Sequence, residues 1–512
     1  MPEPTLPRYP TLYQLNTRVW LTALSRRLGR PATLADVPDE ELDRLATAGF
    51  DWIWLLSLWQ TGPASRQVSR TNLEWRHEFE SILPDLTDDD IAGSGFALTG
   101  YAVDQRLGGD AALADLRARL SRRGIRLLLD FVPNHTGLDH PWVDEHPEYY
   151  VSGSELDLIN EPGNYRWIGA RGGERLLAHG RDPYFAGWSD TLQLDYSNAH
   201  LRDAMQAELV AVSQRCDGVR CDMAMLVLPD VFERTWGRPA VPFWAEAIGR
   251  VHEERPDFMF MAEVYWDLES RMLDLGFDYA YDKRLYDRLR AGLARPVREH
   301  LGADLCYQDR LARFLENHDE PRAAATFRPG QEQAAAVVTY LSPGLRFFHQ
   351  GQFEGRRVRI PPHLVRAPEE PADPLVEQLY DALLALLRKP TARAGAWRQL
   401  ECQPAWEGNP TWDNFIAFEW QGPSDDTWLI ALNYGQSQGQ CYIRIGGDRL
   451  RDSTVWLTDQ LSAARYVRSG DDLHDRGLYL DLPAWGHHAF ALALNEPDVR
   501  GGSAGPPPGD LG

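Results

Sequence analysis

The sequence has few cysteines and no stretch that is hydrophobic enough to cross a membrane. Its five cysteines are scattered, and none lies in the Cys-x-x-Cys spacing of a zinc site or redox motif. No apolar run reaches the roughly 18 residues that a membrane-spanning helix needs. The first residues, MPEPTLPRYP, lack the basic and apolar segments of a secretion signal. We therefore expect a cytoplasmic protein with no disulfide framework, no structural metal and no membrane partner.

Positive charge is also scarce. The chain has 53 Lys and Arg against 75 Asp and Glu, a formal net charge of −22. This charge argues against nucleic acid as a partner, because phosphates would be repelled. A neutral substrate such as a sugar is compatible with it.

The pattern of apolar segments predicts a parallel barrel. A chain of 512 residues is expected to form two or three domains. Apolar, β-type segments alternate with helical segments up to about residue 390, which predicts an α/β protein with a (β/α)8 TIM barrel. A doubly wound open sheet would also alternate, but no GxGxxG follows an early strand. The expected strands are residues 12–16, 52–56, 126–132, 218–223, 258–264, 277–281, 313–317 and 345–349.

Two other regions depart from the alternation. A segment rich in turn residues after the third expected strand predicts a short inserted subdomain. Near the C-terminus, short β-type runs separated by turns predict an antiparallel β-sandwich, followed by a Gly- and Pro-rich tail that we expect to be disordered. The expected domains are the barrel (1–136 and 191–392), the inserted subdomain (137–190), the sandwich (393–496) and the tail (497–512).

Polar clusters follow four of the expected strands. A barrel places its catalytic groups at the carboxyl ends of its strands, so these clusters predict a single pocket rich in carboxylates. The four segments are DFVPNHT (130–136), GVRCD (218–222), MAEV (261–264) and ENHD (316–319).

In order and content, these segments resemble the four sequence regions of the α-amylase superfamily, glycoside hydrolase family thirteen. The resemblance covers roughly residues 12–390 and includes FFHQGQFEG after the eighth expected strand. It implies a retaining glycosidase with Asp222 as nucleophile and Glu263 as general acid/base. Asp319 resembles the family's third carboxylate, which binds substrate hydroxyls.

The chemistry of these residues is consistent with such roles. A retaining glycosidase needs two carboxyl groups about 5–5.5 Å apart, one ionised and one protonated. Arg220 and Asp222 are two residues apart on a strand, so they share a face and the guanidinium favours the Asp222 carboxylate. Glu263 lies in the apolar segment MFMAEVY, which should raise its pKa toward that of a general acid. Asp130 is expected to be structural, paired with Arg220.

Further candidates bind substrate. His135 and His318 resemble the two family histidines that hydrogen-bond the sugar in subsite −1, the subsite of the reacting sugar ring. Phe96 stands in GSGFALTGYAVD where the family usually carries a stacking tyrosine, so the stacking face is kept and the hydroxyl is lost. Arg220 completes the family's site.

Three other side chains have two readings each. Tyr265 and Trp266 are candidates for stacking on a sugar, although most aromatic residues of this size belong to the core. Arg322 either contacts substrate or pairs with Glu320 on a surface turn.

Asn134 resembles a position that binds calcium in many members of the family, although a role in capping the loop is an alternative. After Asp222, Met225 and Leu226 stand where endo-acting amylases carry Lys-His, a pair that contacts the leaving-group sugar and supports calcium. We therefore expect no required cofactor, with Ca²⁺ near Asn134 as the alternative.

The predicted function is hydrolysis of α-glucosidic bonds in short oligosaccharides or small glucosides through a covalent glycosyl-enzyme. A transglycosylase or glucanotransferase using the same intermediate is an alternative, because only the acceptor differs. A non-catalytic carbohydrate-binding barrel is a third reading, but such proteins usually lose a carboxylate or the arginine, and all are present here. The expected partner is an α-glucoside or α-glucan oligosaccharide; the sequence predicts neither the exact sugar nor the oligomeric state.

Overall fold

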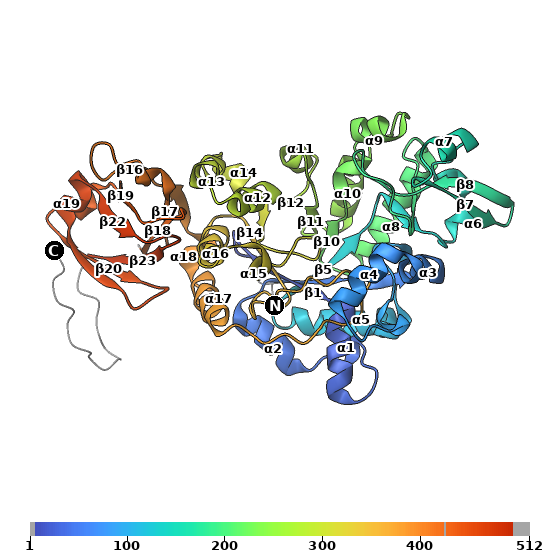
Figure 1. Ribbon diagram of the computed structural model, residues 1–512, viewed down its shortest axis with the longest axis horizontal. Helices are drawn as coiled ribbons and strands as arrows, with labels where there is room; N and C mark the ends of the chain where they lie inside the picture. The colour runs from blue at the N-terminus through green and yellow to red at the C-terminus, as the bar shows by residue number, and fades with distance from the viewer. Residues whose placement is uncertain (1–5, 424–425, 495–512) are drawn as a thin grey trace. The chain divides into compact units, whose positions relative to one another are not determined.

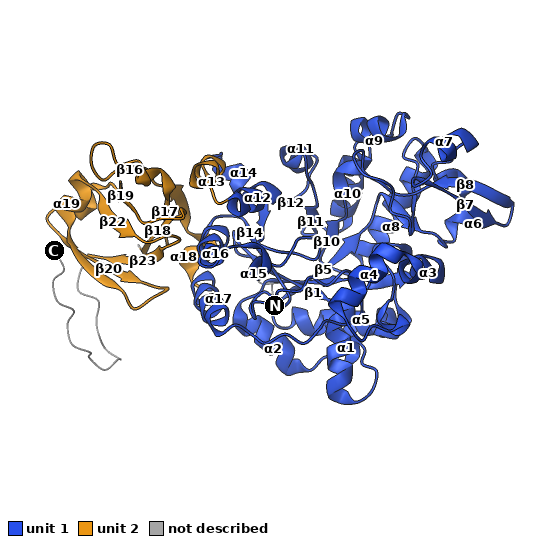
Figure 2. Cartoon of the chain, viewed as in Figure 1, with its two compact units in different colours: residues 1–291, 303–388 blue, residues 292–302, 389–512 orange. Residues whose placement is uncertain are grey.

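The computed structural model describes residues 6–423 and 426–494 (Figure 1). The chain divides into two units, one of residues 1–291 and 303–388, the other of residues 292–302 and the chain from 389 onward (Figure 2). The tail expected to be disordered, 497–512, lies outside the described residues. All five cysteines are free thiols. Within the described ranges, no helix has both the length and the apolar character of a membrane span.

The first unit contains a closed barrel of eight strands in which all neighbours are parallel, which confirms the predicted (β/α)8 architecture. These strands are buried over nearly their whole length, which explains their continuous apolar sequence. In order around the barrel they are β1 (Thr11–Asn16), β14 (Leu345–His349), β13 (Leu311–Arg313), β12 (Tyr279–Tyr281), β11 (Met259–Ala262), β10 (Gly218–Cys221), β5 (Arg126–Phe131) and β2 (Trp52–Leu56).

The seventh strand differs from the expectation. It ends at Arg313 rather than near residue 317. The Asn317 Oδ1 atom accepts hydrogen bonds from the backbone N–H groups of Asp319 and Glu320, both at 2.9 Å. This side-chain turn takes the polar residues of ENHD out of the barrel wall and into the loop above it.

Aspartates close the amino-terminal end of the barrel. Each directly precedes one strand and accepts the first free N–H of the neighbouring strand, a group that would otherwise be buried without a partner. Three such bonds, each 2.8 Å, join Asp51 to Thr11, Asp217 to Leu127 and Asp278 to Phe260.

Helices connect the strands. In α5, Leu113, Leu116 and Leu120 are buried at a spacing of three and four residues, so they form one apolar face. The main helices of this unit are α1 (Thr17–Leu28), α2 (Asp39–Ala48), α5 (Gly109–Ser121), α8 (Ala199–Ser213), α9 (Pro229–Trp236), α10 (Trp244–Glu254), α11 (Glu269–Asp274), α12 (Lys283–Ala291), α16 (Gln331–Leu341) and α17 (Pro374–Leu387).

Two long insertions leave the carboxyl ends of β2 and β5. The second corresponds to the segment expected as a subdomain, and its base is closed by antiparallel pairing of β6 with β9. The first insertion contains β3 (Trp59–Thr61), α3 (Pro63–Thr71), α4 (Leu73–Ile82) and β4 (Leu98–Val103). The second contains β6 (His135–Gly137), α6 (Trp142–Glu145), α7 (Glu155–Asn160), β7 (Tyr165–Ala170), β8 (Gly173–Ala178) and β9 (Thr191–Gln193).

The second unit holds two antiparallel sheets whose inner faces share one hydrophobic core, which confirms the predicted C-terminal sandwich. The larger sheet has the order β15 (Ala396–Gln399), β17 (Phe415–Gln421), β18 (Thr427–Asn433), β23 (His487–Ala493), β20 (Thr454–Asp459) and β21 (Arg465–Ser469). The smaller has the order β16 (Cys402–Pro404), β19 (Gly439–Ile443) and β22 (Leu478–Leu482).

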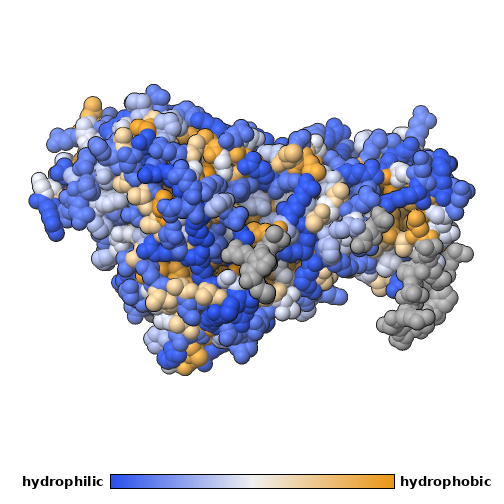
Figure 3. All heavy atoms as spheres, turned by 180° about the vertical axis from the view of Figure 1, so that it is seen from behind, coloured by the Kyte–Doolittle hydropathy of each residue, from blue (hydrophilic) through white to orange (hydrophobic). Residues whose placement is uncertain are grey.

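Helix α13 (Ala294–Leu301) belongs to this second unit although it precedes β13 in the sequence. Its Arg295 and Arg298 both pair with Asp413. The expected boundary near residue 392 did not include this segment. The face of the molecule seen in Figure 3 is mostly hydrophilic, with apolar residues in small groups.

Candidate active site

A cavity of about 290 Å³ lies at the carboxyl ends of the barrel strands. Its walls come from the residues that follow β10, β11 and β13, from both insertions and from the segment after β14. The lining residues are Trp75, Ser94, Phe96, His135, Trp188, Asp190, Thr191, Asp222, Met223, Glu263, Tyr265, Asp319 and His363.

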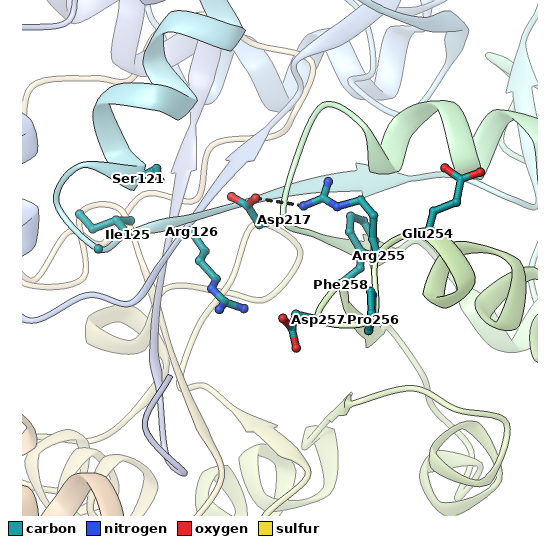
Figure 4. A pocket seen from close by; sticks show the side chains of 10 residues that line it. Ser121, Ile125, Arg126, Asp217, Glu254, Arg255, Pro256, Asp257 and Phe258 are labelled. Carbon is teal, nitrogen blue, oxygen red and sulfur yellow. Dashed lines mark hydrogen bonds and ion pairs between the residues drawn. The ribbon is translucent and has the colours of Figure 1, made fainter. Parts of the chain in front are cut away.

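A second hollow, of about 250 Å³, lies at the opposite end of the barrel, where β5, β10 and β11 begin (Figure 4). Its Asp217 pairs with Arg117 at 2.5 Å and with Arg255 at 3.5 Å. The same carboxylate accepts the Leu127 N–H. These groups therefore hold strand ends together, as the amino-terminal face of such a barrel normally does, and the chemistry belongs to the first cavity.

Arg220 lies behind the carboxyl groups and holds them in place. Its Nη1 lies 2.7 Å from Asp222 Oδ1, and its Nη2 lies 2.7 Å from Glu263 Oε2. Asp130, in register with Arg220 on the neighbouring strand, is 3.4 Å from Nη1. The guanidinium is buried and lies 5.2 Å from the centre of the Phe96 ring. Arg220 therefore positions the cluster and does not line the cavity.

Glu263 is surrounded by hydrogen-bond donors. Its Oε2 accepts from Arg220 and from the Met223 N–H, and its Oε1 accepts from the Tyr265 hydroxyl, each at 2.7 Å. Met223 has a φ of 42°, a left-handed conformation that is uncommon outside glycine. Burial raises the pKa of Glu263, Arg220 opposes this effect and Asp222 adds to it. The direction agrees with its apolar sequence context.

The pKa of Asp222 differs from the expectation that Arg220 would favour its ionised form. Burial raises its pKa above the ordinary value, and the charge and hydrogen bond of Arg220 only partly offset this effect. Burial likewise raises the pKa of Asp130 to about 7. Several buried carboxyl groups thus share one guanidinium, which only partly offsets the effect of burial on their pKa values.

His318 and Asp319 adjoin the carboxylate pair. The Gln14 amide lies 2.9 Å from His318 Nδ1, which leaves Nε2 facing Asp319 Oδ2 at 3.0 Å. The Phe96 ring stacks on His318 at 5.3 Å. The Asp319 side chain is 44% exposed, toward the cavity that it lines. Burial holds the pKa of His318 well below its usual value, so this ring is neutral.

His135 lies on the opposite part of the wall. Its ring centre is 5.2 Å from that of Trp188, which also lines the cavity. Burial lowers its pKa to about 4, so it too is neutral at physiological pH. A neutral imidazole offers one donor and one acceptor, which suits the hydroxyl groups of a sugar.

Besides Arg220 and His318, two more predicted substrate-binding residues do not line the cavity. Trp266 packs edge-on against Tyr184, with ring centres 5.1 Å apart. Arg322 is buried and binds Glu316 Oε1 at 2.6 Å and the Gln350 carbonyl at 2.9 Å. Its partner is thus Glu316 rather than the expected Glu320, and its guanidinium serves to hold the loop.

The sequence interpretation missed several lining residues, among them Trp75, Ser94, Asp190 and His363. They lie in the insertions and in the segment after β14, where no motif marks them. The one available signal was that Asp190 directly precedes the strand on which the second insertion returns to the barrel.

The surroundings of Asn134 do not fit a calcium ion. Its Oδ1 atom accepts from Gln193 Nε2 at 3.0 Å. The same Nε2 donates to the carbonyl oxygens of Asn134 and Leu194, both at 3.0 Å. Calcium needs six to eight oxygen ligands, whereas here an amide binds the available oxygens. Throughout residues 6–423 and 426–494, no three His, Cys, Asp or Glu side chains cluster as a metal site would require.

Comparison with known proteins relates these features to a family. The chain matches the family model "Alpha amylase, catalytic domain" over residues 39–284. It is 22% identical over 304 residues to Alpha-amylase 3 of Dictyoglomus thermophilum, covering 54% of this chain and 57% of that protein. It is 25% identical over 334 residues to Alpha-amylase MalA of Haloarcula japonica, covering 63% of this chain and 42% of that protein. The chain thus spans about half the length of these relatives.

Solved structures share the fold over nearly the whole chain. A maltogenic α-amylase, AmyB, from Thermotoga neapolitana superposes with a TM-score of 0.67 at 17% identity, covering 95% of this chain and 99% of that one. An α-amylase from Geobacillus thermoleovorans, complexed with acarbose, superposes with a TM-score of 0.65 at 19% identity, covering 96% of this chain and 99% of that one. Residues 39–284, which hold three of the four strand-end segments, thus match the α-amylase catalytic domain, and the barrel has the fold of solved α-amylases.

Proposed function

We propose that the protein is a retaining glycoside hydrolase that cleaves α-glucosidic bonds in short oligosaccharides or small glucosides. The observation that carries this proposal is the contact of one guanidinium with both carboxyl groups, at 2.7 Å from Asp222 Oδ1 and 2.7 Å from Glu263 Oε2. Both acids also line one cavity. Contact with one guanidinium favours the short separation of a retaining pair, about 5–5.5 Å, which leaves no space for a water molecule in line with the scissile bond.

In the first step, the Asp222 carboxylate attacks the anomeric carbon and forms an ester with the sugar. Glu263 gives its proton to the glycosidic oxygen as the bond to the leaving group breaks. The carboxylate that remains on Glu263 is stabilised by Arg220 and by the donors described above. In the second step, Glu263 takes a proton from water, whose oxygen attacks the anomeric carbon and releases Asp222. Two inversions give net retention.

Asp319, His135 and His318 are proposed to bind the reacting sugar. Asp319 is open to the cavity and accepts hydrogen bonds from hydroxyls. His135 lines the wall, and His318 stands behind Asp319. Because both imidazoles are neutral, neither adds positive charge near Arg220.

The size of the cavity and its leaving-group side support a small substrate. Met225 and Leu226 are buried and do not line the cavity, so they supply no donor to a sugar. The side near Glu263 is bordered by Met223 and Tyr265. A long polar chain would leave buried hydroxyls unpaired there, at about 1–3 kcal/mol each.

Transfer to a sugar acceptor is a second candidate. Tyr184 is 60% exposed, and its ring lies edge-on against Trp266 with centres 5.1 Å apart. Such an aromatic surface can stack on an acceptor sugar. The glycosyl-enzyme would be the same, and the acceptor hydroxyl would replace water. We further propose that neither reaction needs a bound metal ion, because the oxygens near Asn134 are bound by an amide.

Incubation with 4-nitrophenyl α-glucoside, maltose, sucrose, trehalose and maltooligosaccharides tests the proposal. Proton NMR should show the α-anomer as the first product, and the ratio of free glucose to longer products separates hydrolysis from transfer. A β-anomer released first from an α-substrate would contradict the retaining mechanism. Absence of turnover on every α-glucoside would favour a non-catalytic sugar-binding barrel.

A further inference from the structure

One wall of the cavity carries polar groups that the proposed reaction does not use. Asp190 is 3% exposed, and its Oδ2 atom has no hydrogen-bond partner. Both ring nitrogens of His363 are likewise buried without a hydrogen bond. The Asp190 Oδ2 and His363 Nε2 atoms are 3.6 Å apart, too far for a good hydrogen bond. Buried polar groups are normally satisfied, so this pair indicates a missing partner.

His363 is held by ring packing, and both residues are held by hydrogen bonds to their backbone carbonyls. The His363 ring lies 4.9 Å from Trp75 and 5.7 Å from Phe79, both on α4. The His363 carbonyl accepts the Ala92 N–H at 2.8 Å. The carbonyl of Asp190 accepts the Ser65 hydroxyl at 2.7 Å. The polar atoms are therefore held in fixed positions within the wall of the cavity, which both residues line.

The barrel order shows which part of a substrate this wall faces. Glu263 follows β11, which lies directly across the barrel from β1. β2 and β14 flank β1, and Trp75 and His363 come from the segments that follow them. Because Glu263 protonates the leaving group, the opposite wall must face the glycone, the sugar that becomes bound to Asp222. In a pyranose ring, C4 lies across from the anomeric carbon.

We propose that Asp190 and His363 together bind the C4 hydroxyl of the glycone and thereby make the enzyme exo-acting. The hydroxyl donates its hydrogen to Asp190 Oδ2 and accepts one from His363 Nε2. A single oxygen can lie within hydrogen-bond distance of both atoms, since they are only 3.6 Å apart. A glycone that carries another sugar on O4 has no hydrogen to donate and is excluded. This inference rests on the proposed glycosidase function and specifies its substrate.

Deoxy substrates and the Asp190→Asn variant test this assignment. On 4-nitrophenyl α-glucoside, Asp190→Asn should lower kcat/KM by about 10- to 100-fold. On the 4-deoxy glucoside, the kcat/KM of the wild type should already be low, and the substitution should lower it little further. On the 6-deoxy glucoside, the variant should lose as much as on the parent substrate. Asp144→Asn, in the same insertion and paired with Arg171 outside the cavity, is the matched control and should behave as wild type.

His363→Phe provides an independent variant, because it keeps a ring against Trp75 and removes both nitrogens. It should show the same dependence on the C4 hydroxyl, and it serves in place of Asp190→Asn if that variant does not fold. Wild-type enzyme should release glucose singly from maltotriose and leave maltooligosaccharides blocked at the terminal O4 intact.

Equal losses on the parent and the 4-deoxy substrate would overturn the assignment, as would rapid cleavage of the blocked oligosaccharides. Failure of the proposed function gives a different result. In that case the wild type would turn over no α-glucoside, or a fluoride donor would label a residue other than Asp222.

Discussion

The Nη2 atom of Arg220 lies 2.7 Å from the Oε2 atom of Glu263, so the proposed general acid/base contacts this guanidinium in the free protein. The same guanidinium binds Asp222. One positive charge therefore stabilises both the ionised nucleophile and the carboxylate that Glu263 becomes after it gives up its proton. Burial opposes ionisation of both acids, and the balance between these effects determines the pH dependence.

Glu263→Gln should separate the two steps of the reaction. With 4-nitrophenyl α-glucoside or maltose, loss of the general acid/base should lower kcat by about 10²- to 10⁴-fold. With α-glucosyl fluoride, departure needs no proton, so glycosylation should proceed and deglycosylation should stall. Mass spectrometry should then find the adduct on Asp222. Asp222→Asn should show no turnover and no adduct, and near wild-type activity in that variant would contradict the assignment.

Tyr265→Phe should change the pH profile. The Tyr265 hydroxyl donates to Glu263 Oε1 and lowers the pKa of that acid, so its removal should raise the pKa. Glu263 must be protonated for the first step, and activity is lost as pH rises through this pKa. The alkaline limb of kcat/KM with maltose should therefore move to higher pH.

The control for that experiment is Tyr150→Phe, because the Tyr150 hydroxyl contacts Thr136 rather than a carboxyl group. Its profile should match that of the wild type. With α-glucosyl fluoride, Tyr265→Phe should show no shift of the alkaline limb. A shift to lower pH with maltose would show that the hydroxyl does not stabilise the carboxylate.

Chelation should leave the protein intact, because the Gln193 amide binds the oxygens near Asn134. EDTA is expected to change neither Tm nor kcat. Gln193→Ala should lower the free energy of unfolding by about 1–3 kcal/mol, since buried acceptors lose their donor. In Gln193→Glu, the carboxylate should repel these oxygens, and added Ca²⁺ should raise the Tm of this variant only. A drop of the wild-type Tm in EDTA would disprove this account.

Soluble starch should be a poor substrate. The cavity is small, and Met223 and Tyr265 border its leaving-group side, so an internal segment of a glucan chain is not accommodated. Iodine staining should fall slowly while reducing ends accumulate. A fast loss of staining with few reducing ends would demonstrate endo-cleavage and contradict this prediction.

Much of the barrel and the carboxylate cluster was readable in the sequence. The strands are short, buried on both sides and therefore continuously apolar, and Asp222 and Glu263 follow them directly. The barrel brings the carboxyl ends of all its strands to one face. The residue that directly follows each strand in the sequence is therefore expected in the site. The end of β13 was misplaced because the turn made by Asn317 depends on a single side chain.

Other features were decided only by tertiary structure. Asp190 and His363 lie 173 residues apart in the sequence and meet because the first insertion holds both, His363 through Trp75 of α4 and Asp190 through Ser65 of α3. Arg322 binds Glu316 rather than Glu320, and Gln193 binds the oxygens near Asn134. The sequence by itself determined the barrel and the strand-end carboxylates, since these follow from periodicity and strand ends. The glycone wall, the buried partners and the membership of α13 depended on how distant segments pack, which no local pattern encodes.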